Sequence, residues 1–267
     1  MQPKKKNKKT IKPVQKPFLR GNAVDGTTLV SAVKFFFSLL GLVLANLLLG
    51  TLAMWDIQWL NILFICALLL VVYGVYYQNG MGKGTAAVNQ GEILLQRRET
   101  GRTVSAKEQA GCFHPAKGFL IALIGLAPAL VCCVLLACVA QKQYTGLGAL
   151  PSWISSLQRQ SETAGALAMY NQVSTMDMES GLRVIVRLLI MPFVNMVGSD
   201  NRDGLLLLER LSVLPMLLPG ISYGIGYLQG VKVRTQVHTD IAMGKRKRAR
   251  KDKKRRQSRA KAPEQLN

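Results

Sequence analysis

Residues 118–141 read GFLIALIGLAPALVCCVLLACVAQ, a stretch of 24 residues without a charged side chain. A bilayer core about 30 Å thick is crossed by roughly 20 apolar residues in an α-helix. Three further stretches are uncharged over at least 21 residues each, namely 35–55, 57–82 and 211–231. Together the four stretches predict an all-α integral membrane protein with four transmembrane helices.

Charge and hydrophobicity occupy different parts of this chain. Hydrophobic residues make up 49% of the 267 residues, although the formal net charge is +21. The basic excess is +8 over 1–34, +3 over 83–117 and +11 over 232–267, whereas 142–210 is neutral. Basic segments beside membrane helices stay on the cytoplasmic side. The sequence therefore predicts that both termini are cytoplasmic, and the bacterial plasma membrane is the expected location.

These patterns divide the chain into seven predicted segments. The first four are a disordered basic cytoplasmic tail (1–28), a transmembrane hairpin (29–78), a cytoplasmic loop with short surface helices (79–115) and a third transmembrane helix (116–141). The last three are an external loop with interfacial helices (142–204), a fourth transmembrane helix (205–231) and a second disordered basic cytoplasmic tail (232–267). In the cytoplasmic loop, one helix is expected to end at Gly101. Another is expected to begin at Ser105, whose spacing to Glu108 matches a capping box.

Residues 182–198 of the external loop are apolar enough to resemble a fifth span. Arg183 and Arg187 argue against that interpretation, because an arginine at the centre of a membrane helix costs about 2.5–3.5 kcal/mol on the insertion scale. The two arginines are four residues apart and share one helical face. An amphipathic helix in the outer interface is the preferred prediction, and a re-entrant segment broken at Pro192 is the alternative.

Glu209 is the acidic residue that stands at the outer edge of the fourth predicted membrane helix. It is expected to form an ion pair with Arg183 or Arg187 across the outer surface. A charge in or near the membrane is a functional hypothesis by default, although ion pairs at helix ends also serve as ordinary scaffolding.

Two other patterns resemble chemical sites. Residues 80–85 (GMGKGT) resemble a phosphate-binding loop, but Gly84 rather than serine or threonine directly follows the lysine, and the run follows a predicted membrane helix instead of a strand. Cys112, His114 and His238 include a Cys-x-His pair, but zinc sites normally show two close pairs of ligands. The sequence predicts no catalytic residue, no cofactor and no metal site.

The basic block near the C-terminus is the strongest pattern in the chain. Lysine or arginine fills 12 of the 17 positions from 245 to 261. Anionic lipid headgroups, RNA or an acidic protein are the expected partners, and an orientation signal is the simpler alternative. No aromatic residue follows Tyr227, so RNA contact would be sequence-blind. The ten residues expected to bind anionic partners are Lys245, Arg246, Lys247, Arg248, Arg250, Lys251, Lys253, Lys254, Arg255 and Arg256.

The leading hypothesis for function is a non-enzymatic accessory or scaffold protein of the membrane, which engages anionic partners through its basic tails. The alternative is a small transporter, channel or transport-complex subunit, suggested by the prolines and glycines of the fourth predicted helix. A membrane enzyme comes third, because Cys112, His114 and His238 have no visible catalytic partners.

Overall fold

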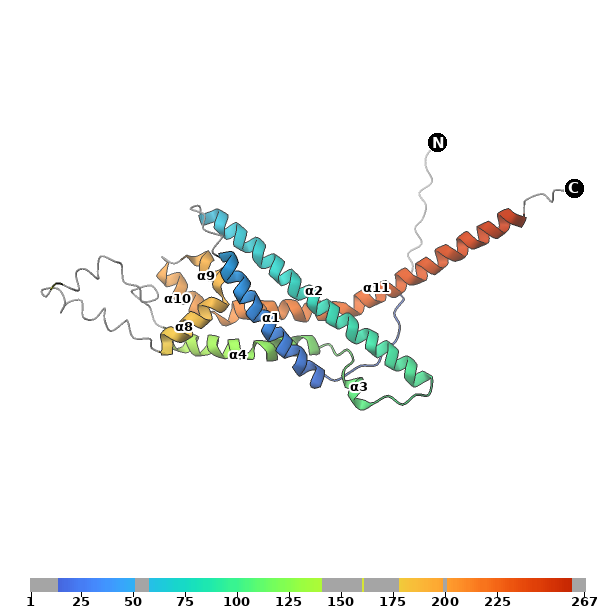
Figure 1. Ribbon diagram of the computed structural model, residues 1–267, viewed down its shortest axis with the longest axis horizontal. Helices are drawn as coiled ribbons and strands as arrows, with labels where there is room; N and C mark the ends of the chain where they lie inside the picture. The colour runs from blue at the N-terminus through green and yellow to red at the C-terminus, as the bar shows by residue number, and fades with distance from the viewer. Residues whose placement is uncertain (1–13, 51–57, 141–159, 161–177, 199–200, 261–267) are drawn as a thin grey trace, which may run out of the picture.

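The computed structural model describes residues 14–50, 58–140, 160, 178–198 and 201–260. Within these residues every regular element is an α-helix (Figure 1). The helices are α1 (Gly26–Gly50), α2 (Gln58–Glu99), α3 (Ala106–Ala110), α4 (Lys117–Val139), α8 (Met178–Leu189), α9 (Met191–Val197), α10 (Arg202–Arg210) and α11 (Val213–Ala260).

Four of these helices form an elongated bundle, with α1 and α4 running one way and α2 and α11 returning (Figure 1). The helices α8, α9 and α10 cluster at one end, which we call the Glu209 end; α3 and the start of α1 lie at the other, the Asp25 end. Three of the described helices, α1, α2 and α4, are long and apolar enough to cross a membrane. The number rises to five if each of two bent helix pairs forms one span.

The first helix begins at Gly26, three residues before the predicted start of the hairpin at 29. Asp25 caps it, because the Thr28 amide donates to the Asp25 carboxylate at 2.8 Å. Residues 14–25 were predicted to be disordered, but hydrogen bonds tie them to the rest of the molecule. The amide of Leu19 donates to the Gly91 carbonyl, and that of Gly21 donates to the Phe113 carbonyl.

Helix α2 corrects the predicted boundary at 78–79. It continues without interruption to Glu99, so 79–99 is the second half of a 42-residue helix rather than a loop with a short surface helix. The helix continues through Gly80 and Gly84. Packing against α11 overrides their poor helix propensity.

The end of α2 and the start of α3 agree with the sequence prediction. Gly101 follows α2 with φ 78°, the left-handed conformation that glycine adopts at little cost. Ser105 begins α3 with a capping box, in which its own amide donates to the Glu108 carboxylate at 3.3 Å. The third predicted membrane helix also corresponds closely to α4, which includes Pro128.

Two sharp bends interrupt the apolar segments near the Glu209 end. Helices α8 and α9 meet at 93°, with Pro192 in the first turn of α9. Such a bent pair has the form of a broken span or of a re-entrant segment. The preferred interfacial position of this segment stays a prediction. Helices α10 and α11 meet at 51°. The fourth predicted helix, 205–231, is therefore two helices, separated at Leu211 and Ser212.

Helix α11 corrects the prediction of a disordered tail from 232. It continues to Ala260, and its second half projects beyond the bundle as an arm (Figure 1). A helix that is already formed adds residues more easily than a new one begins, and lysine, arginine and alanine are good helix formers. Residues 1–13 and 261–267 of the predicted tails, and most of the predicted external loop 142–204, lie outside the described residues.

The main hydrophobic core lies between α1, α4, α8 and α11. Leu126, Cys133 and Leu136 of α4 are almost completely buried in it, together with Val186 of α8. Aromatic rings from three helices meet at its Asp25 side: the Phe35 ring lies 5.2 Å from the rings of both Tyr76 and Tyr223. The core thus joins the bent segments to the long helices.

Candidate functional site

Two arginines of α8 meet one glutamate of α10 inside the protein. Arg183 Nε donates to Glu209 Oε2 at 3.0 Å, and Arg187 Nε donates to Glu209 Oε1 at 2.7 Å. Arg183 also donates to Glu179 Oε1 at 2.8 Å. The side chains of Arg183 and Glu209 are only 1% and 3% exposed. We call these four residues the Glu209 cluster.

The Glu209 cluster follows from the spacing of charges along α8. Glu179, Arg183 and Arg187 recur every four residues and so share one helical face, which packs toward the last turn of α10. Two positive and two negative charges compensate one another, as buried charges must. Three of these residues, Arg183, Arg187 and Glu209, were predicted from the sequence. Glu179 was missed, although its spacing of four from Arg183 pointed to it. A functional role for the cluster stays a prediction.

Glycines allow the backbones of α2 and α11 to touch where the two helices cross. A Cβ atom added at Gly80 or Gly84 would collide with the carbonyl oxygens of Tyr223 or Tyr227. On the other helix, a Cβ atom at Gly226 would meet the Tyr77 carbonyl. Both helices carry small residues four apart at this crossing, as in close contacts between membrane helices. This pair makes the most extensive helix contact in the described structure.

Beyond the crossing, an ion-pair network holds α11 to α2. Arg234 donates to Glu92 Oε2 at 2.9 Å and to Asn89 Oδ1 at 2.6 Å. His238, one turn further along α11, lies with Nε2 2.8 Å from Glu92 Oε1. We call these four residues the arm anchor. They hold α11 against α2 where α11 leaves the bundle. No local pattern predicted a contact between residues so far apart in the chain.

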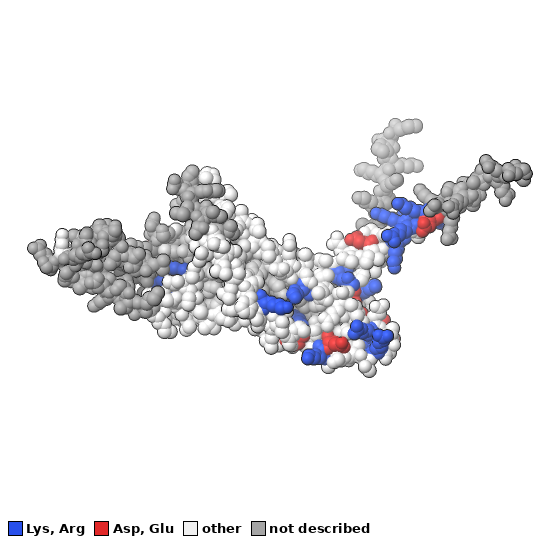
Figure 2. Space-filling view, in the orientation of Figure 1, with Lys and Arg blue, Asp and Glu red and all other residues white. Residues whose placement is uncertain are grey.

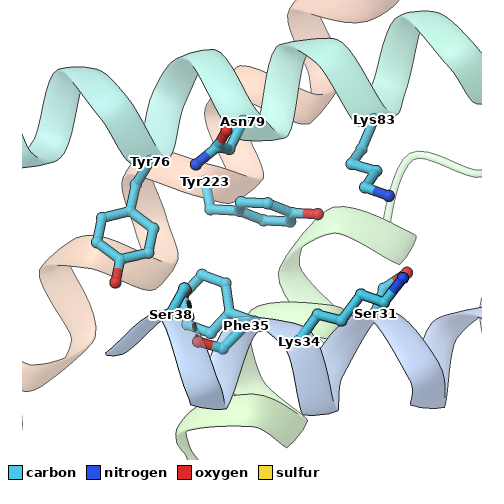
Figure 3. A pocket seen from close by; sticks show the side chains of 8 residues that line it. All are labelled: Ser31, Lys34, Phe35, Ser38, Tyr76, Asn79, Lys83 and Tyr223. Atoms are coloured by element: carbon cyan, nitrogen blue, oxygen red, sulfur yellow. Dashed lines mark hydrogen bonds between the residues drawn. The ribbon is translucent and has the colours of Figure 1, made fainter. Parts of the chain in front are cut away.

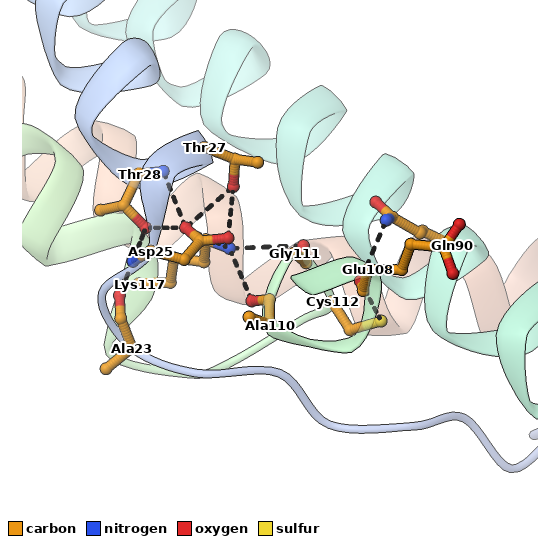
Figure 4. Close-up of polar contacts among 10 residues, drawn as sticks. All are labelled: Ala23, Asp25, Thr27, Thr28, Gln90, Glu108, Ala110, Gly111, Cys112 and Lys117. Atoms are coloured by element: carbon orange, nitrogen blue, oxygen red, sulfur yellow. Dashed lines mark hydrogen bonds and ion pairs between the residues drawn. The ribbon is translucent and has the colours of Figure 1, made fainter. Parts of the chain in front are cut away.

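A second buried ion pair closes the Asp25 end (Figure 4). Lys117 Nζ lies 3.1 Å from Asp25 Oδ1 and donates to the carbonyls of Ala110 and Gly111 at 3.3 Å each. Burial acts to raise the pKa of Asp25, but the Thr28 and Thr27 hydroxyls, the Thr28 amide and the Lys117 ammonium together lower it below its ordinary value. This pair ties the start of α1 to the start of α4.

The basic residues predicted to bind anionic partners all lie on the arm of α11. The side chains that the structure describes among them, from Lys245 to Lys253, are exposed. Figure 2 shows blue lysine and arginine side chains mainly over the Asp25 end and along the arm, with a broad uncharged zone across the middle of the molecule. The ten residues are therefore carried on one helix rather than on a disordered tail.

The three residues considered as zinc ligands have separate surroundings. The buried Cys112 thiol faces the Glu108 carbonyl at 3.8 Å, His114 Nδ1 accepts from the Ala116 amide at 3.3 Å, and His238 belongs to the arm anchor. Burial raises the pKa of the Cys112 thiol, which keeps it in the protonated form that is a poor nucleophile. No group of three potential metal ligands occurs within the described ranges.

The chain was compared with protein-family models, curated protein sequences and solved structures, and none of the three comparisons found a match.

Proposed function

We propose that this chain is a non-enzymatic scaffold protein of the membrane whose α11 arm binds nucleic acid through phosphate contacts, without sequence preference. The observation that carries the proposal is the continuity of α11 from its apolar half, beginning at Val213, to the basic block, ending at Ala260. The positive charges are attached by a helix, which holds them at a set position relative to the bundle.

The length of the arm favours a partner in the aqueous phase over the protein's own bilayer surface. The uncharged part of α11 ends at Val231. At about 1.5 Å per residue, Lys245 lies about 21 Å beyond this point and Arg256 about 38 Å beyond it. The Debye length at physiological ionic strength is about 8 Å, so headgroups at the base of the arm attract these residues only weakly.

The distribution of charge around the arm favours nucleic acid over the face of an acidic protein. Successive residues of a helix are about 100° apart, so the basic positions from 245 to 256 surround the helix on every side. Phosphates that line both walls of a groove can neutralise such a helix, whereas a protein surface contacts one face. The arm has no aromatic residue for base stacking.

The proposal includes four membrane spans with both termini in the bacterial cytoplasm. It rests on the basic excess at the Asp25 end and on the pairing of directions among α1, α2, α4 and α11. Labelling of single cysteines placed at 253 and at 153, with a reagent that does not cross membranes, tests the orientation. Exclusive labelling of position 153 in intact cells is expected, and labelling of position 253 would contradict the orientation.

The binding proposal is tested by the salt dependence of RNA binding to the full chain in detergent. The arm variant replaces five residues by glutamine: Lys245, Arg246, Lys247, Arg248 and Arg250. With about 0.7–0.9 counterions released per contact, the slope of log affinity against log salt should fall by about 3.5–4.5 in this variant. Fluorescence anisotropy of a labelled duplex RNA and of labelled polyuridine gives the slope.

A matched control separates the arm from net charge. Five lysines near the N-terminus are replaced by glutamine, which removes the same charge: Lys4, Lys5, Lys6, Lys8 and Lys9. The slope should change much less in this control than in the arm variant. Equal losses would mean that charge alone draws the RNA, and capture of an acidic protein without RNA would assign the arm to another class of partner. Either result would refute the proposal.

A small transporter or channel is the second candidate, favoured by the 93° break between α8 and α9. Helix α9 packs against α1 and α2, and the Glu209 cluster lies beside it. Broken helices and buried charges form transport sites in other membrane proteins. Chloride and proton flux into vesicles containing the protein tests this candidate: Glu209→Gln should alter the flux, and vesicles that match protein-free ones would exclude transport of these ions.

A further inference from the structure

A pocket of about 150 Å³ opens between α1 and α2, with α11 behind it (Figure 3). Helix α1 packs mainly against α4 and α9, and α2 packs mainly against α11 and α9, so few direct contacts join α1 to α2. This arrangement leaves room between them. The pocket is lined by Ser31, Lys34, Phe35, Ser38, Tyr76, Asn79, Lys83 and Tyr223.

One end of this pocket is basic and the other is aromatic. In Figure 3 the ammonium groups of Lys34 and Lys83 and the hydroxyl of Tyr223 lie toward the same end, whereas the rings of Phe35 and Tyr76 lie toward the other. No carboxylate is among the lining residues. In the part of the chain that the structure describes, neither lysine forms an ion pair. Two positive charges thus converge on a space without a protein counter-ion.

The two lysines mark the same membrane boundary. Lys34 directly precedes the uncharged run 35–55, and Lys83 directly follows the uncharged run 57–82. Since α1 and α2 run in opposite directions, the start of one run and the end of the other lie at the same level, at the Asp25 end. This is the level of lipid headgroups, where the long side chain of a lysine can hold its ammonium group near phosphate.

We propose that this pocket binds the phosphate headgroup of an anionic phospholipid between Lys34 and Lys83. Ser31 and Asn79 supply hydroxyl and amide groups for hydrogen bonds to phosphate or glycerol oxygens. The acyl chains lie along the apolar side chains that α1 and α2 expose, such as Phe37 and Val75 at 64% and 51%. These exposed side chains favour a lipid over a free phosphate ion, which gains nothing from them.

The site is distinct from the proposed RNA-binding arm, so each proposal can fail without the other. The test uses the full chain, delipidated in detergent, with phosphatidylglycerol as the probe and phosphatidylcholine as the neutral comparison. Native mass spectrometry counts the bound lipid. At about fivefold per lysine, the variant Lys34→Gln with Lys83→Gln should bind phosphatidylglycerol about 25-fold more weakly. Binding of phosphatidylcholine should change little.

Three controls define what the result means. Lys107→Gln with Lys232→Gln removes two exposed lysines elsewhere at the Asp25 end and should leave lipid binding near that of the wild type. Lys34→Arg with Lys83→Arg keeps the charge and should retain most of the affinity. All variants keep the basic arm, so its contribution is constant, and the thermal unfolding temperature without lipid verifies folding.

Wild-type affinity in the doubly neutralised variant would overturn the site. Equal losses in the Lys107 and Lys232 control would overturn it as well, because they would reduce the effect to general surface charge. Glycerol phosphate and inorganic phosphate are tested as competitors. Competition by either at the concentration where phosphatidylglycerol competes would show a small-anion site and would refute the lipid assignment.

Discussion

Charged side chains are mostly buried and paired at one end of the bundle and mostly exposed at the other. At the Glu209 end, Arg183, Arg187 and Glu209 are turned inward and neutralise one another, together with Glu179. At the Asp25 end, one ion pair is buried, while Lys34, Lys83 and the arm leave positive charge facing outward. Charge that is already paired inside a protein holds helices together, whereas unpaired charge outside is free to bind. We therefore propose that the charges of the Glu209 end anchor helices and that those of the Asp25 end bind anionic partners.

Glu209→Gln should destabilise the protein more than any other substitution considered, because it disrupts the buried Glu209 cluster. Glu209→Gln leaves the two arginines of α8 without their shared buried partner, and loss of one partner from a buried ion pair typically costs about 3–5 kcal/mol. Arg210→Gln is the matched control, because Arg210 is adjacent and exposed, and it should cost less than about 0.5 kcal/mol. Denaturant unfolding in detergent, followed by circular dichroism, measures both. Similar stability of the two variants would contradict the cluster's role.

The next substitution tests the crossing of α2 and α11, from which α11 continues toward the Asp25 end. Gly84→Leu places a side chain where the Tyr227 backbone lies, so the helices must move apart, at a cost of about 1–3 kcal/mol or more. Gly82→Leu adds the same side chain to the same helix at a position with open space around it. The free energy of unfolding should fall in the first variant and change little in the second. A larger loss of unfolding free energy for Gly82→Leu would mean that the face of α2 with Gly82, rather than the face with Gly84, contacts α11.

Acid should weaken the buried pair at the Asp25 end. The pKa of Asp25 is lower in the folded protein than in the unfolded chain, so its contribution to stability is present above about pH 4 and is lost as the pH falls through the folded pKa. Asp25→Asn should cost about 1.5–3 kcal/mol at pH 7, and its difference from the wild type should shrink as the pH falls below about 4. Unfolding measured across this range gives the result. A difference that stays constant with pH would assign the loss to something other than the carboxylate.

The smallest effect concerns the arm anchor. Arg234→Gln removes a partly exposed charge from Glu92, and we expect a loss of about 1 kcal/mol in the free energy of unfolding. Lys232→Gln, two residues earlier and exposed, is the control. The affinity of the arm for RNA should change little in either variant, because the basic block is untouched. A large loss of RNA binding in Arg234→Gln would mean that the anchor itself contacts the partner.

Some of this architecture was predictable because it depends on local sequence. The uncharged run 118–141 predicted α4 to within a few residues, and Gly101 and Ser105 predicted the end of α2 and the start of α3. A contact of Glu209 with Arg183 or Arg187 was also expected, and the structure shows both contacts.

The rest depends on contacts between distant residues, which have no local pattern. Gly80 and Gly84 resemble a loop until α11 is known to pack against them. Asp25 and Lys117 are 92 residues apart in the sequence, and Glu92 and Arg234 are 142 apart. The block from 245 onward resembles a disordered tail by composition, and its helix depends on the preceding part of α11, which the anchor holds in place.

The proposed function depends on a continuous helix α11 that carries the basic block beyond the bundle. Spin labels at 232 and 253, in a chain whose five native cysteines are replaced, test it by pulsed electron paramagnetic resonance. A continuous helix predicts one narrow distance distribution centred near 32 Å, allowing about 1.5 Å per residue over the 21 residues. A broad distribution centred near 25 Å, as a flexible chain of that length gives, would contradict it.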